Sequence, residues 1–162
     1  MIEAVRVAGE ADTDQLVRLA VEARQAAQAS RGGEMYLLRD VRQPPLAPMI
    51  REALTDETQL ALIGTLDDAP VGYALSRLED WPDGSTVAVV DEIYVEQAGR
   101  QLGVGECLVL TVLDWAAERG CRGVQATALP GDRDTKNLFE RFGLVARAIV
   151  VYRPLVTGTN ET

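Results

Sequence analysis

One stretch of the sequence constrains the fold more than any other, because it joins a strand, a glycine-containing loop and a helix. The β-rich run Thr86 to Val95 is followed by a loop that ends in Arg100-Gln101-Leu102-Gly103-Val104-Gly105. Apolar residues then recur at helical spacing, at Leu108 and Val112 among others. This order of elements predicts a domain in which the glycine loop opens a helix directly after a central strand.

A helix start of this kind is suited to binding an anion. Its first backbone N–H groups have no intrahelical acceptor, and the helix dipole adds partial positive charge there. Gly103 and Gly105 permit close approach and positive φ, so a side chain at Gly103 would stand where a phosphate must approach. Arg100 could add a charge-assisted contact. An ordinary strand-to-helix turn also fits this pattern, which matches neither the GxxxxGK[ST] nor the GxGxxG phosphate loop.

Periodicity predicts the other elements on both sides of this stretch. Before it we expect a strand at Val5–Val7, a helix at Thr13–Ala29, a short helix near Pro48–Leu54, and strands at Leu60–Leu66 and Val71–Leu78. After it we expect a helix that ends at Gly120, a strand at Val124–Ala128, a helix at Thr135–Phe142 and a final strand at Val145–Tyr152. The connection Ser30–Pro48 is long and partly apolar, which is typical of a binding-site wall.

The length of the chain and its charge narrow the classes of protein to consider. With 162 residues, we expect one domain at 1–155 and a disordered tail at 156–162. A net charge of −9 without a basic run argues against nucleic-acid binding and against anionic membrane surfaces. An apolar run long enough to span a membrane is missing, as is the apolar core of a signal peptide, so we expect a cytoplasmic protein.

Missing residue types exclude several kinds of active site. The sequence contains no histidine, which excludes a Ser-His-Asp triad, a Cys-His dyad and histidine-rich metal sites. The two cysteines, Cys107 and Cys121, have the spacing of neither a zinc site nor a CxxC redox motif. We therefore expect no metal, and any general base must be a carboxylate, a tyrosine or a water chain.

The glycine loop and a second motif together resemble the GCN5-related N-acetyltransferase (GNAT) family. Arg100, Gly103 and Gly105 match the family signature (R/Q)xxGx(G/A). The run Leu138-Phe139-Glu140-Arg141-Phe142-Gly143-Leu144 is similar to the second motif, (L/F)YEKxGF. The resemblance covers nearly the whole chain. It implies a mixed α+β fold with a central mixed, mostly antiparallel sheet flanked by helices. The implied order is strand, two helices, three strands, helix, strand, helix and one or two final strands.

The resemblance also implies a co-substrate, acetyl-CoA, and the residues that hold it. Its pyrophosphate would lie at Gln101 to Glu106. Its pantetheine would contact the end of the preceding strand, which is bulged in the family, and a backbone N–H near this bulge, around Ile93 to Val95, could polarise the thioester carbonyl. The implied cofactor-binding residues are Ile93, Tyr94, Val95, Arg100, Gln101, Leu102, Gly103, Val104, Gly105, Glu106 and Asn137.

The sequence departs from the family at two positions. Many members carry a tyrosine in the second motif that protonates the departing thiolate, and Phe139 stands there instead. Many also carry an asparagine seven residues earlier, where this chain has Asp132; Asn137 could substitute for it. The acid could then be water, Tyr94 or Tyr152, or the domain could be catalytically silent.

Two adjacent acids, Asp91 and Glu92, are the candidate catalytic residues. They resemble paired acids at the same place in polyamine acetyltransferases of the family, where Asp91 would match the base and Glu92 a substrate-binding acid. Because successive strand residues point to opposite faces, only one of the pair should face a given side. Either acid could instead cap a strand end or pair with an arginine.

The sequence therefore indicates an acyl-CoA-dependent N-acyltransferase that moves an acetyl group to a primary amine by direct attack. The acceptor would be a small molecule or a protein amino group, and a homodimer is left open. The alternative is a silent domain of the same fold that binds acyl-CoA as a sensor or interaction module.

Overall fold

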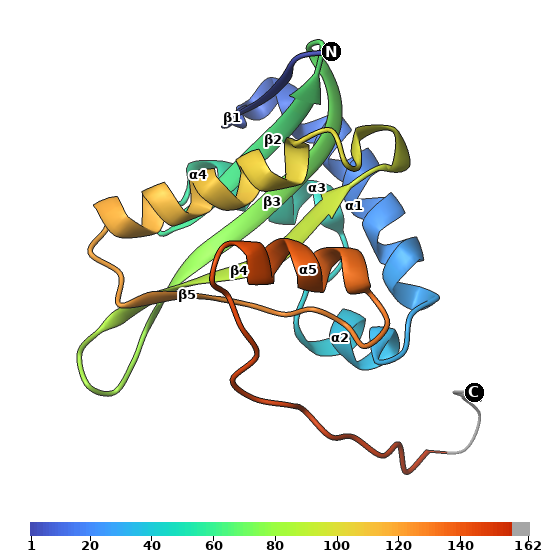
Figure 1. Ribbon diagram of the computed structural model, residues 1–162, viewed down its shortest axis with the longest axis vertical. Helices are drawn as coiled ribbons and strands as arrows, with labels where there is room; N and C mark the ends of the chain where they lie inside the picture. Colours follow the sequence, from blue (N-terminus) through green and yellow to red (C-terminus); the bar gives the residue numbers. More distant parts are fainter. Residues whose placement is uncertain (157–162) are drawn as a thin grey trace.

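The computed structural model describes residues 1–156 and centres on a five-stranded sheet (Figure 1). The strands lie in the order β1-β2-β3-β4-β5. Neighbours are antiparallel except for the parallel pair β4–β5, which confirms the expected mixed, mostly antiparallel sheet. The strands are β1 (Glu3–Val7), β2 (Gln59–Leu66), β3 (Ala69–Asp80), β4 (Thr86–Val95) and β5 (Gly123–Ala126).

Helices cover both faces of this sheet. They are α1 (Thr13–Gln28), α2 (Gly33–Arg39), α3 (Leu46–Thr55), α4 (Val104–Glu118) and α5 (Arg133–Arg141), with short 3-10 turns at Glu10–Asp12 and Gln97–Gly99. Because side chains alternate along a strand, Ile63 of β2 packs with α1 and α3, whereas its neighbour Leu62 packs with α4. Two apolar clusters, one on each face, therefore hold the three layers together.

The connection Ser30–Pro48 contains an additional helix, α2. Gly32, with φ +76°, precedes it, and this left-handed conformation favours glycine. The sequence predicted a binding-site wall here without predicting the helix. Figure 1 shows α2 below α5, and both helices contribute residues to the lining of the cleft described below.

Strands β4 and β5 separate partway along their length. Their pairing ends at Val90 and Ala126, and β4 continues to Val95 with only β3 beside it. The register of β4 against β3 shifts at the same point, so that Asp91 is an extra residue in a β-bulge. A gap in the sheet edge and a bulge therefore coincide at Asp91.

The predicted final strand at Val145–Tyr152 is wrong: within residues 1–156, no strand follows β5. The chain leaves α5 at Gly143 and runs away from the sheet (Figure 1). A strand needs a neighbour for its backbone hydrogen bonds, and none lies beside this segment, although its β-branched composition suits one. Of the predicted tail, residues 157–162 lie outside the described residues.

Candidate active site

A cleft of about 770 Å³ lies at the gap between β4 and β5. The loop before α4 contributes Gln101 to its lining, the first turn of α4 contributes Gly105 and Glu106, and the bulge contributes Asp91 and Glu92. Helices α1, α2 and α5 and the loop after β5 contribute to the other walls. The cleft therefore connects a helix N-terminus with a pair of carboxylates.

The N-terminus of α4 presents free backbone donors to this cleft. The first intrahelical bond runs from the N–H of Cys107 to the carbonyl of Gly103 over 3.0 Å, so the N–H groups of Val104, Gly105 and Glu106 precede the ladder. Gln101 and Gly103 have φ values of 62° and 88°, which turn the loop into the helix. These donors and the helix dipole make an anion-binding position.

Gly103 and Gly105 have structural roles that differ from the role suggested by the sequence, close approach to a phosphate at Gly103. A Cβ built on Gly103 would face the side chain of Glu3 at 3.4 Å rather than the cleft, so its left-handed φ is the reason for glycine. A Cβ on Gly105 would lie 3.1 Å from Cδ2 of Leu138, which packs against it from α5. Gly105 is therefore the position at which the side chain of Leu138 approaches the backbone of α4 closely.

Two arginines lie beside the helix start. Arg100 donates from Nε to the carbonyl of Val95 over 2.8 Å, and its guanidinium lies 5.8 Å from the ring centre of Tyr94. It thereby fixes the end of β4 to the loop. Arg141 of α5 pairs with Glu106 over 2.9 Å, and both line the cleft. Arg141 was not among the residues expected from the sequence.

The cleft brings together most of the predicted cofactor-binding residues. Ile93, Tyr94, Val95, Arg100, Gln101, Gly105, Glu106 and Asn137 line it. The side chains of Leu102 and Val104 lie elsewhere: Leu102 is exposed, and Val104 is fully buried against the sheet. Phe139 is buried in α5 outside the lining, and Asp132 caps α5 by accepting from the N–H of Thr135.

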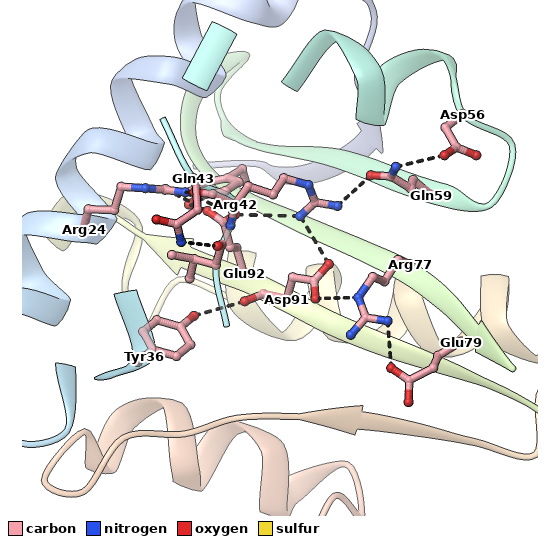
Figure 2. A network of polar contacts seen from close by, with 12 residues as sticks. Arg24, Tyr36, Arg42, Gln43, Asp56, Gln59, Arg77, Glu79, Asp91 and Glu92 are labelled. Atoms are coloured by element: carbon pink, nitrogen blue, oxygen red, sulfur yellow. Dashed lines mark hydrogen bonds and ion pairs between the residues drawn. The ribbon is translucent and has the colours of Figure 1, made fainter. Parts of the chain in front are cut away.

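The bulge changes the orientation expected for the two acids. Nη1 of Arg42 lies 3.2 Å from the Asp91 carboxylate and 3.7 Å from that of Glu92, so both acids point to one side (Figure 2). The extra residue in β4 breaks the alternation on which the expectation rested. The prediction that only one acid faces a given side is therefore wrong.

Glu92 is a fully buried acid with strong partners. Arg24 of α1 donates from Nη1 over 2.8 Å, and the hydroxyl of Tyr73 donates over 2.9 Å. Burial raises the pKa of Tyr73 well above its usual range, and the nearby charge of Glu92 acts in the same direction. The phenol therefore stays protonated and keeps donating to the carboxylate.

Asp91 lies between the cleft and a smaller hollow of about 210 Å³ that Arg42 and Arg77 also line. Nε of Arg77 lies 3.1 Å from its carboxylate, and the hydroxyl of Tyr36 donates to its carbonyl over 3.0 Å (Figure 2). Burial raises the pKa of Asp91 above its ordinary value, although both arginines oppose this shift. It is the acid better suited to accept a proton.

Sequence reasoning missed the residues that surround these acids. Arg24, Arg42 and Arg77 come from three separate elements, and only the fold brings them together. Tyr36 had a weak signal, since it lies in the partly apolar connection. Within residues 1–156, no cluster of His, Cys, Asp and Glu could hold a metal ion. No helix of this part of the chain is long and apolar enough to cross a membrane.

Comparisons with known proteins agree with this geometry. The sequence profile of the Acetyltransferase (GNAT) family matches residues 18–144. No curated protein matches the chain by sequence.

Three solved structures share the fold. A transcriptional regulator from Bacillus halodurans C-125 is 21% identical, with a TM-score of 0.71 over 95% of this chain and 100% of the other. A ribosomal-protein-alanine N-acetyltransferase from Brucella melitensis biovar Abortus 2308 is 21% identical, with a TM-score of 0.68 over 97% and 100%. AAC(6')-Iy, in complex with the bisubstrate analog CoA-S-monomethyl-acetylneamine, is 19% identical, with a TM-score of 0.69 over 96% and 100%.

Proposed function

Because the chain belongs to the Acetyltransferase (GNAT) family, we propose that it transfers an acetyl group from acetyl-CoA to a primary amine by direct attack in this cleft. The observation that carries the proposal is that one cleft joins the free N–H groups of α4 to Asp91 at the bulge. Such a cleft can hold an anionic donor at one end and a reacting amine at the other.

The residues of the cleft fit acetyl-CoA, which would supply the acetyl group as a thioester. The N–H groups of Val104, Gly105 and Glu106 would bind its pyrophosphate, and Arg141 could add a charge-assisted contact. Its pantetheine would run along Ile93 to Val95, where β5 has separated from β4. Alternate N–H groups of β4 point away from β3 there and could polarise the thioester carbonyl.

Asp91 is the base in this proposal. An ammonium group has an ordinary pKa near 10, far above that of a normal carboxyl group near 4, so a carboxylate base benefits from a raised pKa. Burial raises the pKa of Asp91 in this direction. Its place between the cleft and the smaller hollow would let it accept the proton directly or through a water.

Glu92 has a different part, that of a positioning residue. Its carboxylate already accepts from Arg24 and Tyr73 and lies near Arg42. These contacts hold Arg24, Arg42 and Tyr73 around the bulge. Because the carboxylate of Glu92 is occupied by these partners, it is poorly placed to contact the reacting amine. Glu92 would thus act on the reaction by holding β4 and Arg42 in place beside Asp91.

The acceptor in this proposal is the primary amine of a small molecule or of a protein. The related structures support both classes, since one is named a ribosomal-protein-alanine N-acetyltransferase and another binds an acetylneamine conjugate of CoA. A net charge of −9 would also favour approach of a cationic amine over an anionic one.

Phe139 supports a second candidate, an acyl-CoA-binding domain without catalysis. Its side chain is only 5% exposed, lies outside the cleft lining and has no proton to give to a departing thiolate. In the enzymatic proposal, water in the open cleft protonates that thiolate.

Incubation with acetyl-CoA and a panel of primary amines, including aminoglycosides and peptides with free N-termini, separates the two candidates. Amine-dependent thiol release and an acetylated product by mass spectrometry support the enzyme. Binding of acetyl-CoA by calorimetry without any product supports the silent domain.

A further inference from the structure

Arginines compensate the two acids at the bulge. Glu92 pairs with Arg24 over 2.8 Å. Asp91 pairs with Arg77 over 3.1 Å, and Arg42 lies 3.2 Å from the carboxylate of Asp91 and 3.7 Å from that of Glu92. Figure 2 shows the three guanidinium groups arranged around the two carboxylates. Because opposite charges at such distances compensate one another, this cluster is not a strongly acidic pocket.

Helix α1 runs along β4 and places its C-terminal half beside this cluster. In its first half, Arg18 pairs with Glu96, just beyond the end of β4, over 3.1 Å. Further along the helix, Arg24 reaches Glu92 at the bulge. The C-terminal half of α1 therefore forms the wall of the cleft near the acids, and it does so with small side chains: Ala23, Ala26 and Ala27.

The rest of this wall is also uncharged. Leu37 and Val41 line it beside the alanines. Its hydroxyl groups are already bonded to backbone carbonyls, that of Ser30 to a carbonyl of α1 over 3.3 Å and that of Tyr36 to the carbonyl of Asp91 over 3.0 Å. Among the described residues, the charged side chains that line the cleft away from the bulge belong to the side of α4 and α5: Arg100, Glu106, Asp132, Asp134 and Arg141.

From these observations we propose that the acceptor is a small primary amine with a single positive charge and an apolar body. Its ammonium would lie at Asp91, and its apolar part would pack against the alanines of α1 and against Leu37 and Val41. A second ammonium on the same molecule would find no free carboxylate at this wall, and burying a charge without a partner is costly. The inference rests on the proposed function, because it names the acceptor class of the same cleft.

The wall offers an anionic acceptor no free partner either. Arg24 is the arginine that α1 contributes to the lining, and it donates to Glu92 over 2.8 Å and to the carbonyls of Ala20 and Arg42 over 3.1 and 2.8 Å. A carboxylate on the acceptor would have to break these bonds. Polyamines, aminoglycosides and amino acids are therefore expected to be poor acceptors, although the paired acids alone suggested a polyamine.

Three amines with the same five-carbon chain test this class: pentylamine, cadaverine and δ-aminovalerate. The far end of the chain is neutral in the first, positive in the second and negative in the third. Thiol release at saturating acetyl-CoA gives kcat/KM per amino group. We expect pentylamine to exceed both others by at least about tenfold, because an unpaired charge is costly to bury. Equal use of cadaverine or δ-aminovalerate, or better use of a peptide with a free N-terminus and no charged side chain, would overturn the inference.

Calorimetry with the same amines, on protein saturated with coenzyme A, separates this inference from the proposed function. Pentylamine should again bind at least about tenfold more tightly than the other two. This order of affinity without thiol release from any amine would contradict acetyl transfer and support the ligand class. Thiol release without this order would support acetyl transfer and contradict the ligand class.

A new carboxylate in the wall should reverse the preference. Ala26 is exposed on α1 and lines the cleft, so Ala26→Asp would supply the partner that a second ammonium lacks. We expect the ratio of kcat/KM for cadaverine to that for pentylamine to rise at least about tenfold. Gln25→Asp, at the neighbouring exposed residue outside the lining, adds the same charge and should leave the ratio unchanged. An unchanged ratio in Ala26→Asp with a wild-type circular dichroism spectrum, or an equal rise in both variants, would overturn the inference.

Discussion

Arg24 of α1 and Glu92 of β4 form a buried ion pair, with Nη1 and Oε1 separated by 2.8 Å. The arginine side chain is 16% exposed and that of the acid 4%. Breaking such a pair leaves one charge buried without its partner, which costs far more than breaking a pair at the surface. This pair therefore assigns Glu92 to the support of the site and leaves Asp91 as the acid for proton transfer.

Glu92→Gln should lower the free energy of unfolding by about 3 kcal/mol, because the guanidinium of Arg24 would lose its buried counter-charge. Urea unfolding at pH 7 measures this loss. Glu79→Gln, which breaks the exposed pair with Arg77, is the matched control and should cost no more than about 1 kcal/mol. Equal losses in the two variants would contradict a supporting role for the Arg24–Glu92 pair.

Asp91→Asn should lower kcat/KM for the amine by about 10²–10⁴-fold at neutral pH, the usual contribution of a general base. Because burial raises the pKa of Asp91, the active carboxylate forms above the ordinary range of an aspartate, and the wild-type rate should rise with pH. The loss in the variant should shrink as the pH approaches the pKa of the amine.

Rate profiles from pH 6 to 10 measure this effect. Asp40→Asn, which removes a neighbouring acid paired with Arg39, is the control and should change the rate by only a few fold. If Asp91→Asn behaves like this control at neutral pH, the amine loses its proton elsewhere.

Phe139→Leu should reduce turnover by at most a few fold, since the residue is buried in α5 outside the cleft lining. The substitution should cost about 1 kcal/mol of stability through poorer packing. Thiol release and thermal unfolding, measured on the same preparation, separate the two effects. Complete loss of activity in a folded variant would show that the ring does more than fill space.

The ion pair between Arg6 and Asp12 predicts a pH-dependent contribution to stability. Arg6 donates twice to the carboxylate, at 2.7 and 2.8 Å, and Gly9 donates from its N–H; mainly through Arg6 the pKa of Asp12 falls to about 2. A lowered folded-state pKa gives stability that is present above the unfolded value near 4 and is lost as the pH falls toward 2.

Asp12→Asn should therefore cost about 1 kcal/mol at pH 7 and progressively less from pH 4 to pH 2. Urea unfolding across this range measures the difference from wild type. Asp68→Asn, at an exposed turn position, should give no such trend. A loss that is the same at pH 7 and pH 2 would mean that the contact does not act through the charge.

Local pattern predicted the elements of the core well but not the geometry of the site. The β-rich composition of Thr86–Val95 predicts a strand, and β4 has the same bounds in the structure. The resemblance implies a bulge around Ile93 to Val95, whereas the structure has it at Asp91, because its position depends on the pairing with β3 and no local signal marks the extra residue. For this reason the sequence suggested opposite orientations for Asp91 and Glu92, whereas Arg42 contacts both.

Long-range contacts explain the other differences between the predictions from sequence and the structure. Arg24, Arg42 and Arg77 approach the acids only after α1, the loop beyond α2 and β3 have packed together. The strand predicted at Val145–Tyr152 has the right composition, but strand formation requires a neighbour, which composition cannot supply. The role predicted for Gly103 was wrong. The direction in which a Cβ would point at this position depends on how the loop packs against β1.

The central claim is that acetyl transfer takes place in the cleft at the start of α4, and Gly105→Val tests it most directly. The added side chain would begin 3.1 Å from Leu138 and narrow the cleft where the pyrophosphate is proposed to bind. Steady-state thiol release with varied acetyl-CoA is measured for wild type, Gly105→Val and the control Gly9→Val, where a Cβ meets nothing within 4 Å. The account predicts amine-dependent turnover in wild type and control, and a KM for acetyl-CoA raised at least about tenfold in folded Gly105→Val, a difference of about 1.4 kcal/mol. An unchanged KM in folded Gly105→Val would contradict it.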